Sequence, residues 1–71
     1  MITMELDAKA IGRRLRELRG VFRKQDEVAN ATGIARATLS FYERGERIPT
    51  AENAAKLAAF YETSTDYIFL G

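Results

Sequence analysis

Residues 36–44 carry side chains that can recognise nucleic-acid bases if this segment is helical. At about 100° per residue, one arc of such a helix presents a long cation, a methyl group, a hydroxyl and an aromatic ring, from Arg36, Ala37, Ser40 and Phe41. The cation can donate a bidentate pair of hydrogen bonds to guanine, the hydroxyl can donate or accept, and the two apolar groups can contact a thymine methyl. The opposite arc holds Leu39 and Tyr42, which favour burial in a core.

Two residue types on which much enzyme chemistry depends are absent from the chain of 71 residues. There is no cysteine and no histidine, which excludes disulfides, thiolate zinc sites and histidine-based acid–base catalysis. A chain of this length also leaves little room for a deep cleft. We therefore expect no enzyme activity, no metal site, no cofactor and no small-molecule ligand.

The net charge of +1 conceals an uneven distribution of charge along the chain. Residues 9–47 hold ten basic residues against five acidic ones, which gives +5, whereas residues 1–8 and 48–71 carry −2 each. Such a basic block attracts a polyanion such as DNA, although arginines also serve solubility. No apolar run is long enough to span a membrane and the N-terminus lacks the pattern of a signal peptide, so we expect a cytoplasmic protein.

The pattern of apolar residues and turn residues predicts five short helices and no strands, so the expected fold class is all-α, a compact five-helix bundle. The first helix begins after the N-cap residue Asp7 and ends at Gly20. Its apolar face comprises Ile11, Leu15, Leu18 and Phe22. The other four helices are expected to begin near Gln25, Arg36, Thr50 and Ser64.

The second and third predicted helices are joined by a tight turn at Gly33, followed by the apolar residue Ile34. Two short helices joined in this way, over about residues 25–44, fit the helix-turn-helix arrangement, whose second helix can enter the major groove of DNA. We expect residues 8–71 to form a single domain around this unit, preceded by an N-terminal segment of residues 1–7.

Short motifs follow one another along nearly the whole chain: Gln25-Asp-Glu-Val-Ala29, Thr32-Gly33-Ile34, Arg36-Ala-Thr-Leu-Ser40, Tyr42-Glu-Arg-Gly45, Arg47-Ile-Pro49 and Ser64-Thr-Asp-Tyr67. In this combination, over about residues 8–71, the sequence resembles the Cro and phage-repressor (Xre) helix-turn-helix family. The resemblance implies a five-helix domain that binds double-stranded operator DNA as a dimer and regulates transcription.

The resemblance also implies roles for individual positions. The base-facing positions of the family match Arg36, Ala37, Ser40 and Phe41. The positions that face the DNA backbone or a flanking base match Gln25, Thr38, Arg44 and Arg47, and we add the neighbouring cations Arg23 and Lys24. A structural ion pair of the family matches Arg19 and Glu43.

Several positions depart from the family pattern. The joint at residues 20–24 is one residue shorter and lacks the customary hydroxyl residue before Gln25. Ala35 replaces a Ser or Thr cap, which weakens the start of the third helix by about 1 kcal/mol. Glu62 replaces a glycine after the fourth helix, where a left-handed conformation is unfavourable for other residues. Phe41 replaces a polar reader, and its ring either contacts DNA or packs against the core or a partner chain.

The C-terminal part of the chain is rich in aromatic residues, namely Phe60, Tyr61, Tyr67 and Phe69. The first prediction for these rings is that they belong to the core. Because other residues already complete one apolar stripe of the fourth helix, Phe60 and Phe69 are also candidates for exposed surface that associates. A homodimer through the C-terminal helices would place two recognition helices about 34 Å apart, one turn of DNA.

Two functions therefore remain open. The first is a sequence-specific transcriptional regulator, a repressor that binds a palindromic or pseudopalindromic operator as a dimer with residues 36–44 in the major groove. The alternative is a protein-interaction module, antitoxin-like or an adaptor, that binds a protein through the same face. Acids such as Asp26 and Glu46 would favour the alternative if they neutralise this face.

Overall fold

The computed structural model describes residues 5–71, and this range contains five α-helices. They are α1 (Ala8–Arg19), α2 (Gln25–Thr32), α3 (Arg36–Glu43), α4 (Ala51–Phe60) and α5 (Thr65–Leu70). The predicted all-α class and the predicted order of the helices are confirmed. Residues 1–4, most of the predicted N-terminal segment 1–7, lie outside the described residues. Among the helices described, none combines the length and the apolar character that crossing a bilayer requires.

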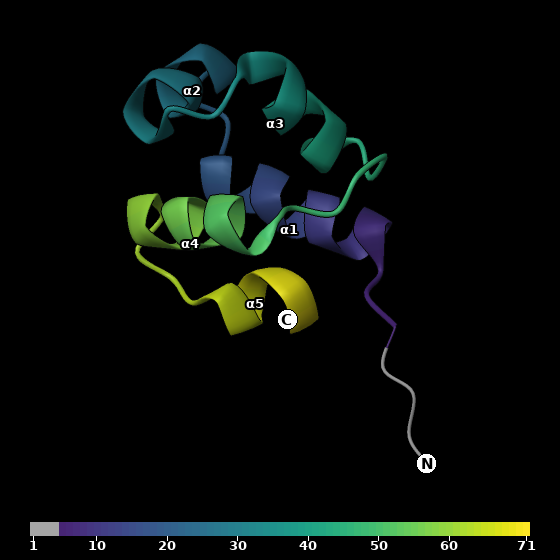
Figure 1. Ribbon diagram of the computed structural model, residues 1–71. Helices are drawn as coiled ribbons and strands as arrows, with labels where there is room; N and C mark the ends of the chain where they lie inside the picture. Colours follow the sequence, from purple (N-terminus) through teal and green to yellow (C-terminus); the bar gives the residue numbers. More distant parts are fainter. Residues whose placement is uncertain (1–4) are drawn as a thin grey trace.

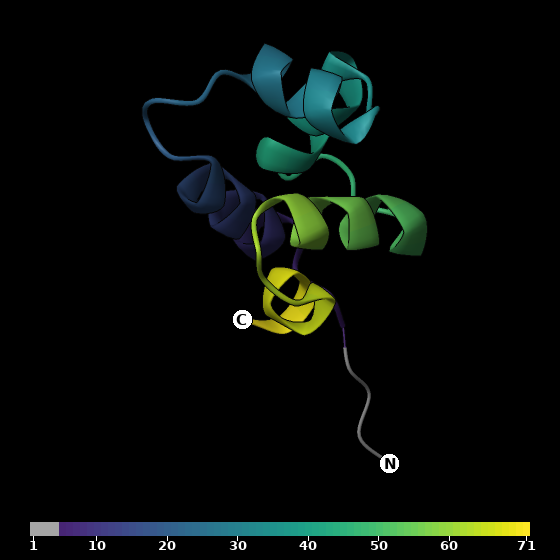
Figure 2. The ribbon, with the colours of Figure 1, turned by 90° about the vertical axis from the view of Figure 1, so that its left-hand side faces the viewer.

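The helices α2 and α3 lie together at one end of the molecule, and α5 lies at the opposite end (Figure 1). The helices α1 and α4 lie between them, as the perpendicular view also shows (Figure 2). The closest neighbours are α1 with α3, α2 with α3, and α5 with both α1 and α4. This arrangement leaves the outer face of α3 uncovered by any other described helix.

Side chains at the N-caps fix where three of the helices begin, as the sequence predicts. The side-chain oxygens that accept hydrogen bonds from backbone N–H groups in the first turn belong to Asp7, Thr50 and Ser64. At the start of α3 the corresponding residue is Ala35, which offers no side-chain hydrogen bond. The expected absence of a cap at the start of α3 is therefore confirmed.

Replacing Thr50 by alanine is expected to lower the free energy of unfolding by about 1 kcal/mol, because the N–H of Asn53 loses the Oγ1 acceptor at 3.1 Å. Urea denaturation followed by circular dichroism measures the change. Thr50→Ser keeps the hydroxyl and should unfold at nearly the same urea concentration as the unchanged protein. An equal loss in both variants would contradict the capping account.

The apolar core draws on all five helices and on the turn between α2 and α3. Its buried residues are Ile11, Leu15, Val28, Ile34, Leu39, Tyr42, Ala54, Leu57, Ala58 and Ile68. Leu18, Phe60 and Phe69 are half-buried and pack against this core. Of the two predictions for Phe60 and Phe69, packing against the core is thus confirmed for part of each ring, and fully exposed surface is wrong.

The prediction that Phe22 continues the apolar face of the first helix is also wrong. α1 ends at Arg19, and Gly20, with φ 72°, turns the chain away from the helix axis. Phe22 and its neighbour Val21 consequently lie in the loop, 94% and 91% exposed. The glycine signal for the helix end decides the structure here, and the helical spacing from Leu18 to Phe22 does not.

A close approach between α1 and the end of α3 depends on Gly12. A Cβ atom at this position would lie 2.6 Å from the backbone oxygen of Tyr42 and 2.7 Å from that of Glu43. At the other end of the bundle, Arg14 Nε donates a hydrogen bond of 3.1 Å to the backbone oxygen of Ile68. These two contacts hold α1 against α3 on one side and α5 on the other.

The second residue after α4, Glu62, adopts the strained conformation that the sequence suggests. Glu62 has φ 55°, in the left-handed region that favours glycine. Backbone hydrogen bonds still close this helix end, since the N–H of Thr63 donates to the oxygen of Ala58 at 2.9 Å. The turn into α5 is therefore formed despite the unfavourable residue.

Candidate nucleic-acid interface

The two faces of α3 differ in burial as the helical periodicity predicts. Leu39 and Tyr42 face the core and are each 3% exposed. On the other side, Arg36 and Ala37 are exposed, and Phe41 is half-buried. The hydroxyl of Tyr42 accepts a hydrogen bond of 2.9 Å from Asn53 Nδ2, which ties the inner face of α3 to α4. The helix is thus held from behind while its outer face stays open.

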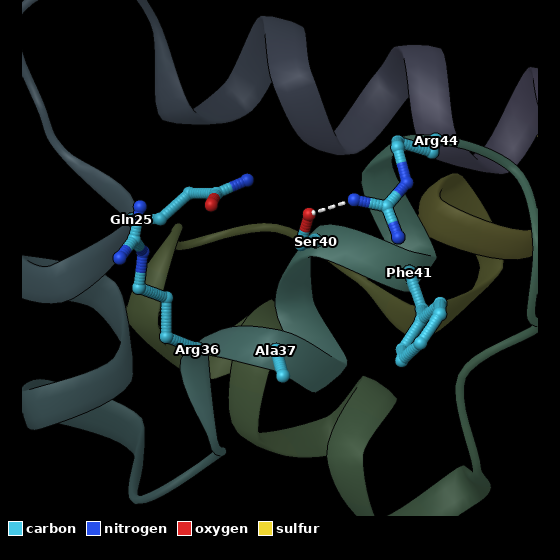
Figure 3. Close-up of a pocket in the computed structure, with 6 residues that line it drawn as sticks. All are labelled: Gln25, Arg36, Ala37, Ser40, Phe41 and Arg44. Atoms are coloured by element: carbon cyan, nitrogen blue, oxygen red, sulfur yellow. Dashed lines mark hydrogen bonds between the residues drawn. The ribbon is translucent and has the colours of Figure 1, made fainter.

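The outer face of α3 borders a shallow groove of about 310 Å³, which we call the α3 groove. Its lining residues are Gln25, Arg36, Ala37, Ser40, Phe41 and Arg44 (Figure 3). The four residues predicted to read bases are all among them, together with two of the residues predicted to contact the DNA backbone or a flanking base. The groove brings hydrogen-bond donors, a hydroxyl, a methyl group and an aromatic ring onto one surface.

Arg44 is fixed at one end of the α3 groove by three neighbours. Its Nη1 donates a hydrogen bond of 2.6 Å to Ser40 Oγ (Figure 3), and its Nε donates to the carboxylate of Glu46. Its guanidinium carbon also lies 5.1 Å from the centre of the Phe41 ring. The same ring lies 4.3 Å from the guanidinium carbon of Arg47. Phe41 thus holds two cations near one edge of the groove through cation–π contacts.

Arg36 lies at the other end of the α3 groove, beside the first turn of α2. Its Nε is 3.4 Å from Asp26 Oδ1. Both side chains remain about two-thirds exposed, at 66% and 67%. An ion pair in this setting contributes little to stability, because water screens the two charges.

Behind the groove, the buried carboxylate of Glu43 joins α1, α2 and α3. Arg19 donates two hydrogen bonds of 2.8 Å to it, and Gln25 Nε2 donates a third of 3.1 Å. Arg19 Nη1 also donates to the backbone oxygen of Arg23, which fixes the loop before α2. Arg19 and Glu43, the pair implied by the family resemblance, therefore form an ion pair that also orients Gln25 at the groove.

The same carboxylate sets the electrostatics of this region. The hydrogen bond to Glu43 raises the pKa of Arg19 above its ordinary value. Burial, together with the negative charge of Glu43, raises the pKa of Tyr61 to about 12. Arg19 therefore stays charged and Tyr61 stays neutral at physiological pH.

Comparison with known proteins places this geometry in a family. A family model described as helix-turn-helix matches residues 13–68. The chain belongs to this helix-turn-helix family, that of Cro and the phage repressors. The match includes α2, the turn at Gly33 and α3, and thus every residue that lines the α3 groove.

The known proteins that are similar to this chain include a phage repressor and a restriction-modification controller protein. One is the cryptic phage CTXphi transcriptional repressor RstR of Vibrio cholerae, 46% identical over 37 residues. That match covers 52% of this chain and 33% of the repressor, so the chain corresponds to about a third of the relative's length. The other is the crystal structure of the restriction-modification controller protein C.AhdI from Aeromonas hydrophila, 33% identical, with a TM-score of 0.80. It covers 89% of this chain and 97% of the controller protein.

Other residues predicted to contact DNA lie outside the α3 groove of this helix-turn-helix domain. Thr38 is half-buried on another side of α3, and Arg23 lies over the Phe60 ring, 5.2 Å from its centre. Lys24 borders a second hollow beside Arg36. Within residues 5–71, no three acidic side chains gather as metal ligands.

The sequence alone does not reveal the partners of the two arginines in the groove. It names Asp26 and Glu46 as acids near this face, but the ion pairs with Arg36 and Arg44 come from the structure. The pair of Arg44 and Glu46 is local, two residues apart, and its spacing is a usable signal. The pair across the turn depends on how α2 and α3 cross, which the spacing does not encode.

Proposed function

We propose that this helix-turn-helix protein is a sequence-specific, DNA-binding transcriptional regulator without catalytic activity. It acts as a repressor that occupies a palindromic or pseudopalindromic operator as a dimer, with α3 in the major groove. The observation that carries the proposal is the α3 groove, where an open face rich in donors is backed by a buried apolar face. A helix with these two faces can lie in a major groove while its inner face stays anchored.

In this proposal the α3 groove supplies the readout of bases. Arg36 donates a bidentate pair to guanine, and Ser40 donates or accepts one hydrogen bond. Ala37 and the open edge of Phe41 contact thymine methyl groups. The exposure of Arg36 and Ala37 supports these roles, because no other described part of the protein covers either side chain.

The contacts to the DNA backbone come from cations and polar groups around the groove. We assign them to Gln25, Thr38, Arg44, Arg47, Lys24 and Arg23. Contacts between the Phe41 ring and the two nearest guanidinium groups restrict how both cations move. Preorganised cations lose less conformational entropy when they bind phosphates.

The dimer in this proposal forms through the C-terminal helices, in the region of Phe60, Tyr61, Tyr67 and Phe69. Leu70 at the end of α5 is 52% exposed and adds apolar surface there. Because α5 lies at the end of the molecule opposite α3, an interface there leaves the α3 groove open (Figure 2). Sedimentation equilibrium at several protein concentrations tests this assembly, and a monomer at the concentration that saturates DNA would contradict it.

Titration of the protein with a random-sequence duplex at several salt concentrations tests DNA binding itself. The logarithm of the binding constant is expected to fall with the logarithm of salt concentration, at roughly −0.9 per neutralised phosphate. Selection of bound duplexes from a random library then identifies the operator, and a palindromic consensus would support both sequence readout and the dimer. A salt-independent binding constant would contradict the proposal.

Replacing Arg47 by alanine is expected to weaken binding to all sequences by a similar factor and to reduce the salt slope by about one phosphate contact. The reason is that Arg47 does not line the α3 groove but lies against the Phe41 ring at its edge, a position that supports a contact to a phosphate. Salt titrations on operator and random duplexes measure both quantities. Lys56→Ala also removes one positive charge, but in α4 and away from α3, so it should change neither the affinity nor the salt slope. If Arg47→Ala weakened binding to the operator alone, that result would contradict the backbone role.

One observation favours the alternative function, a protein-interaction module that uses the same face. Asp26 and Glu46 do pair with arginines of this face, and so reduce its positive charge. Arg47 and Lys24 make no salt bridge within residues 5–71, so the surroundings of the groove remain basic. The salt titration separates the two functions, because a protein-binding face would give no such dependence on random DNA.

A further inference from the structure

The contact between Asp26 and Arg36 uses only one part of the guanidinium group. The carboxylate oxygen lies 3.4 Å from Nε, the nitrogen closest to the side-chain stem. Among residues 5–71, no hydrogen bond occupies the two terminal nitrogens of Arg36. The terminal edge of the guanidinium is therefore available to a ligand while Asp26 stays in place.

Guanine recognition needs an edge of this kind. A bidentate pair to O6 and N7 of guanine uses two parallel N–H groups, which the terminal nitrogens of an arginine provide. An arginine on a long, flexible stem loses conformational freedom when it adopts that orientation, unless a second group already holds it. The carboxylate of Asp26 is such a group, because its attraction at 3.4 Å from Nε restrains the stem side of the guanidinium and leaves the terminal nitrogens open.

We propose that Asp26 is a positioning residue that orients Arg36 for guanine and thereby sets sequence specificity. This inference rests on the proposed function, since it assigns a partner to the base-reading arginine. The negative charge of Asp26 also repels phosphates that approach the start of α2. Asp26 thus raises discrimination at one base pair and lowers the affinity for random DNA.

The exposure of the pair makes this role separable from folding. Both side chains are about two-thirds exposed, so the pair contributes little to the stability of the domain. Removal of the carboxylate should therefore leave α2 and α3 in place.

The experiment compares Asp26→Ala with a matched control in the same helical turn, Glu27→Ala. Glu27 is an exposed acid in the first turn of α2, and it forms no salt bridge within the described residues. Both variants change the net charge equally, so both should bind random duplex somewhat more tightly. Only Asp26→Ala should lose about fivefold in discrimination at the base pair read by Arg36, equivalent to about 1 kcal/mol.

A double-mutant cycle tests whether Asp26 acts through Arg36. In an Arg36→Ala background, Asp26→Ala should cause no further loss of base preference, although it should still raise affinity for random DNA. Competition binding on the selected operator and its single-base variants gives each discrimination ratio, and thermal unfolding checks that every variant is folded. Two results would overturn the inference. One is an equal loss of discrimination in Asp26→Ala and Glu27→Ala, and the other is a loss on Asp26→Ala that is the same with and without Arg36.

The outcomes also separate this inference from the proposed function. The base-reading role of Arg36 fails if the unchanged protein shows no sequence preference, or if the Arg36→Ala variant has the same preference as the unchanged protein. In either case the inference fails as well. If Arg36→Ala abolishes the preference and Asp26→Ala retains it fully, only the inference fails.

Discussion

Replacing Glu43 by alanine is expected to lower the free energy of unfolding by about 3 kcal/mol, the low end of the cost of breaking a buried ion pair. Glu43 is 6% exposed and accepts hydrogen bonds from Arg19 and Gln25. Without the carboxylate, the guanidinium of Arg19 stays charged and only partly reaches water, since its side chain is 22% exposed. Domains of this kind are stable by only about 5–15 kcal/mol, so the loss is a large fraction of the total.

Urea unfolding of the variant measures this loss, with Glu17→Ala as the matched control. Glu17 lies on the exposed side of α1, and its removal should change stability by less than about 0.5 kcal/mol. Glu43→Gln keeps the length of the side chain and removes its charge, so its loss of stability should lie between those of Glu43→Ala and Glu17→Ala. Equal stability of the Glu43 and Glu17 variants would show that the ion pair does not hold the helices together.

The Glu43→Ala change is also expected to alter the α3 groove. Gln25 Nε2 donates to Glu43, so loss of the acceptor releases the side chain that lines one end of the α3 groove. The buried ion pair thus links the stability of the domain to the arrangement of its outer face. We therefore expect DNA binding by the Glu43→Ala variant to weaken even at temperatures where the variant remains folded.

Local signals made the fold predictable from the sequence. The N-caps at Asp7, Thr50 and Ser64 and the helix ends at Gly20 and Gly33 each act within a few residues of the chain. Phe22 shows where such signals conflict. Its spacing from Leu18 fits a helix, yet the glycine before it ends α1 and leaves the ring in the loop.

The composition of the α3 groove was predictable for a similar reason. Helical periodicity alone places Arg36, Ala37 and Ser40 on one arc of α3, opposite Leu39. The contact between Asp26 and Arg36 was not predictable in this way, because it forms only through the crossing of α2 and α3. Side-chain partners across a turn depend on that crossing and on rotamers, neither of which appears in residue spacing.

Replacing Arg36 by alanine is expected to remove about 1–3 kcal/mol of preference at a single base pair of the operator. The side chain borders the α3 groove and is 66% exposed, and within residues 5–71 no hydrogen bond occupies its terminal nitrogens, so a base edge can meet them. Competition binding on the operator and its single-base variants, at one fixed salt concentration, measures the preference.

The informative control for this prediction is Arg36→Lys, which keeps the charge but cannot form the bidentate pair. If geometry carries the readout, lysine should retain most of the affinity for random duplex and still lose the base preference. If charge alone matters, lysine should preserve both, and alanine should weaken operator and random DNA by the same factor. The second pattern would reject Arg36 as a reader of bases and move it to the set of backbone contacts, beside Arg47.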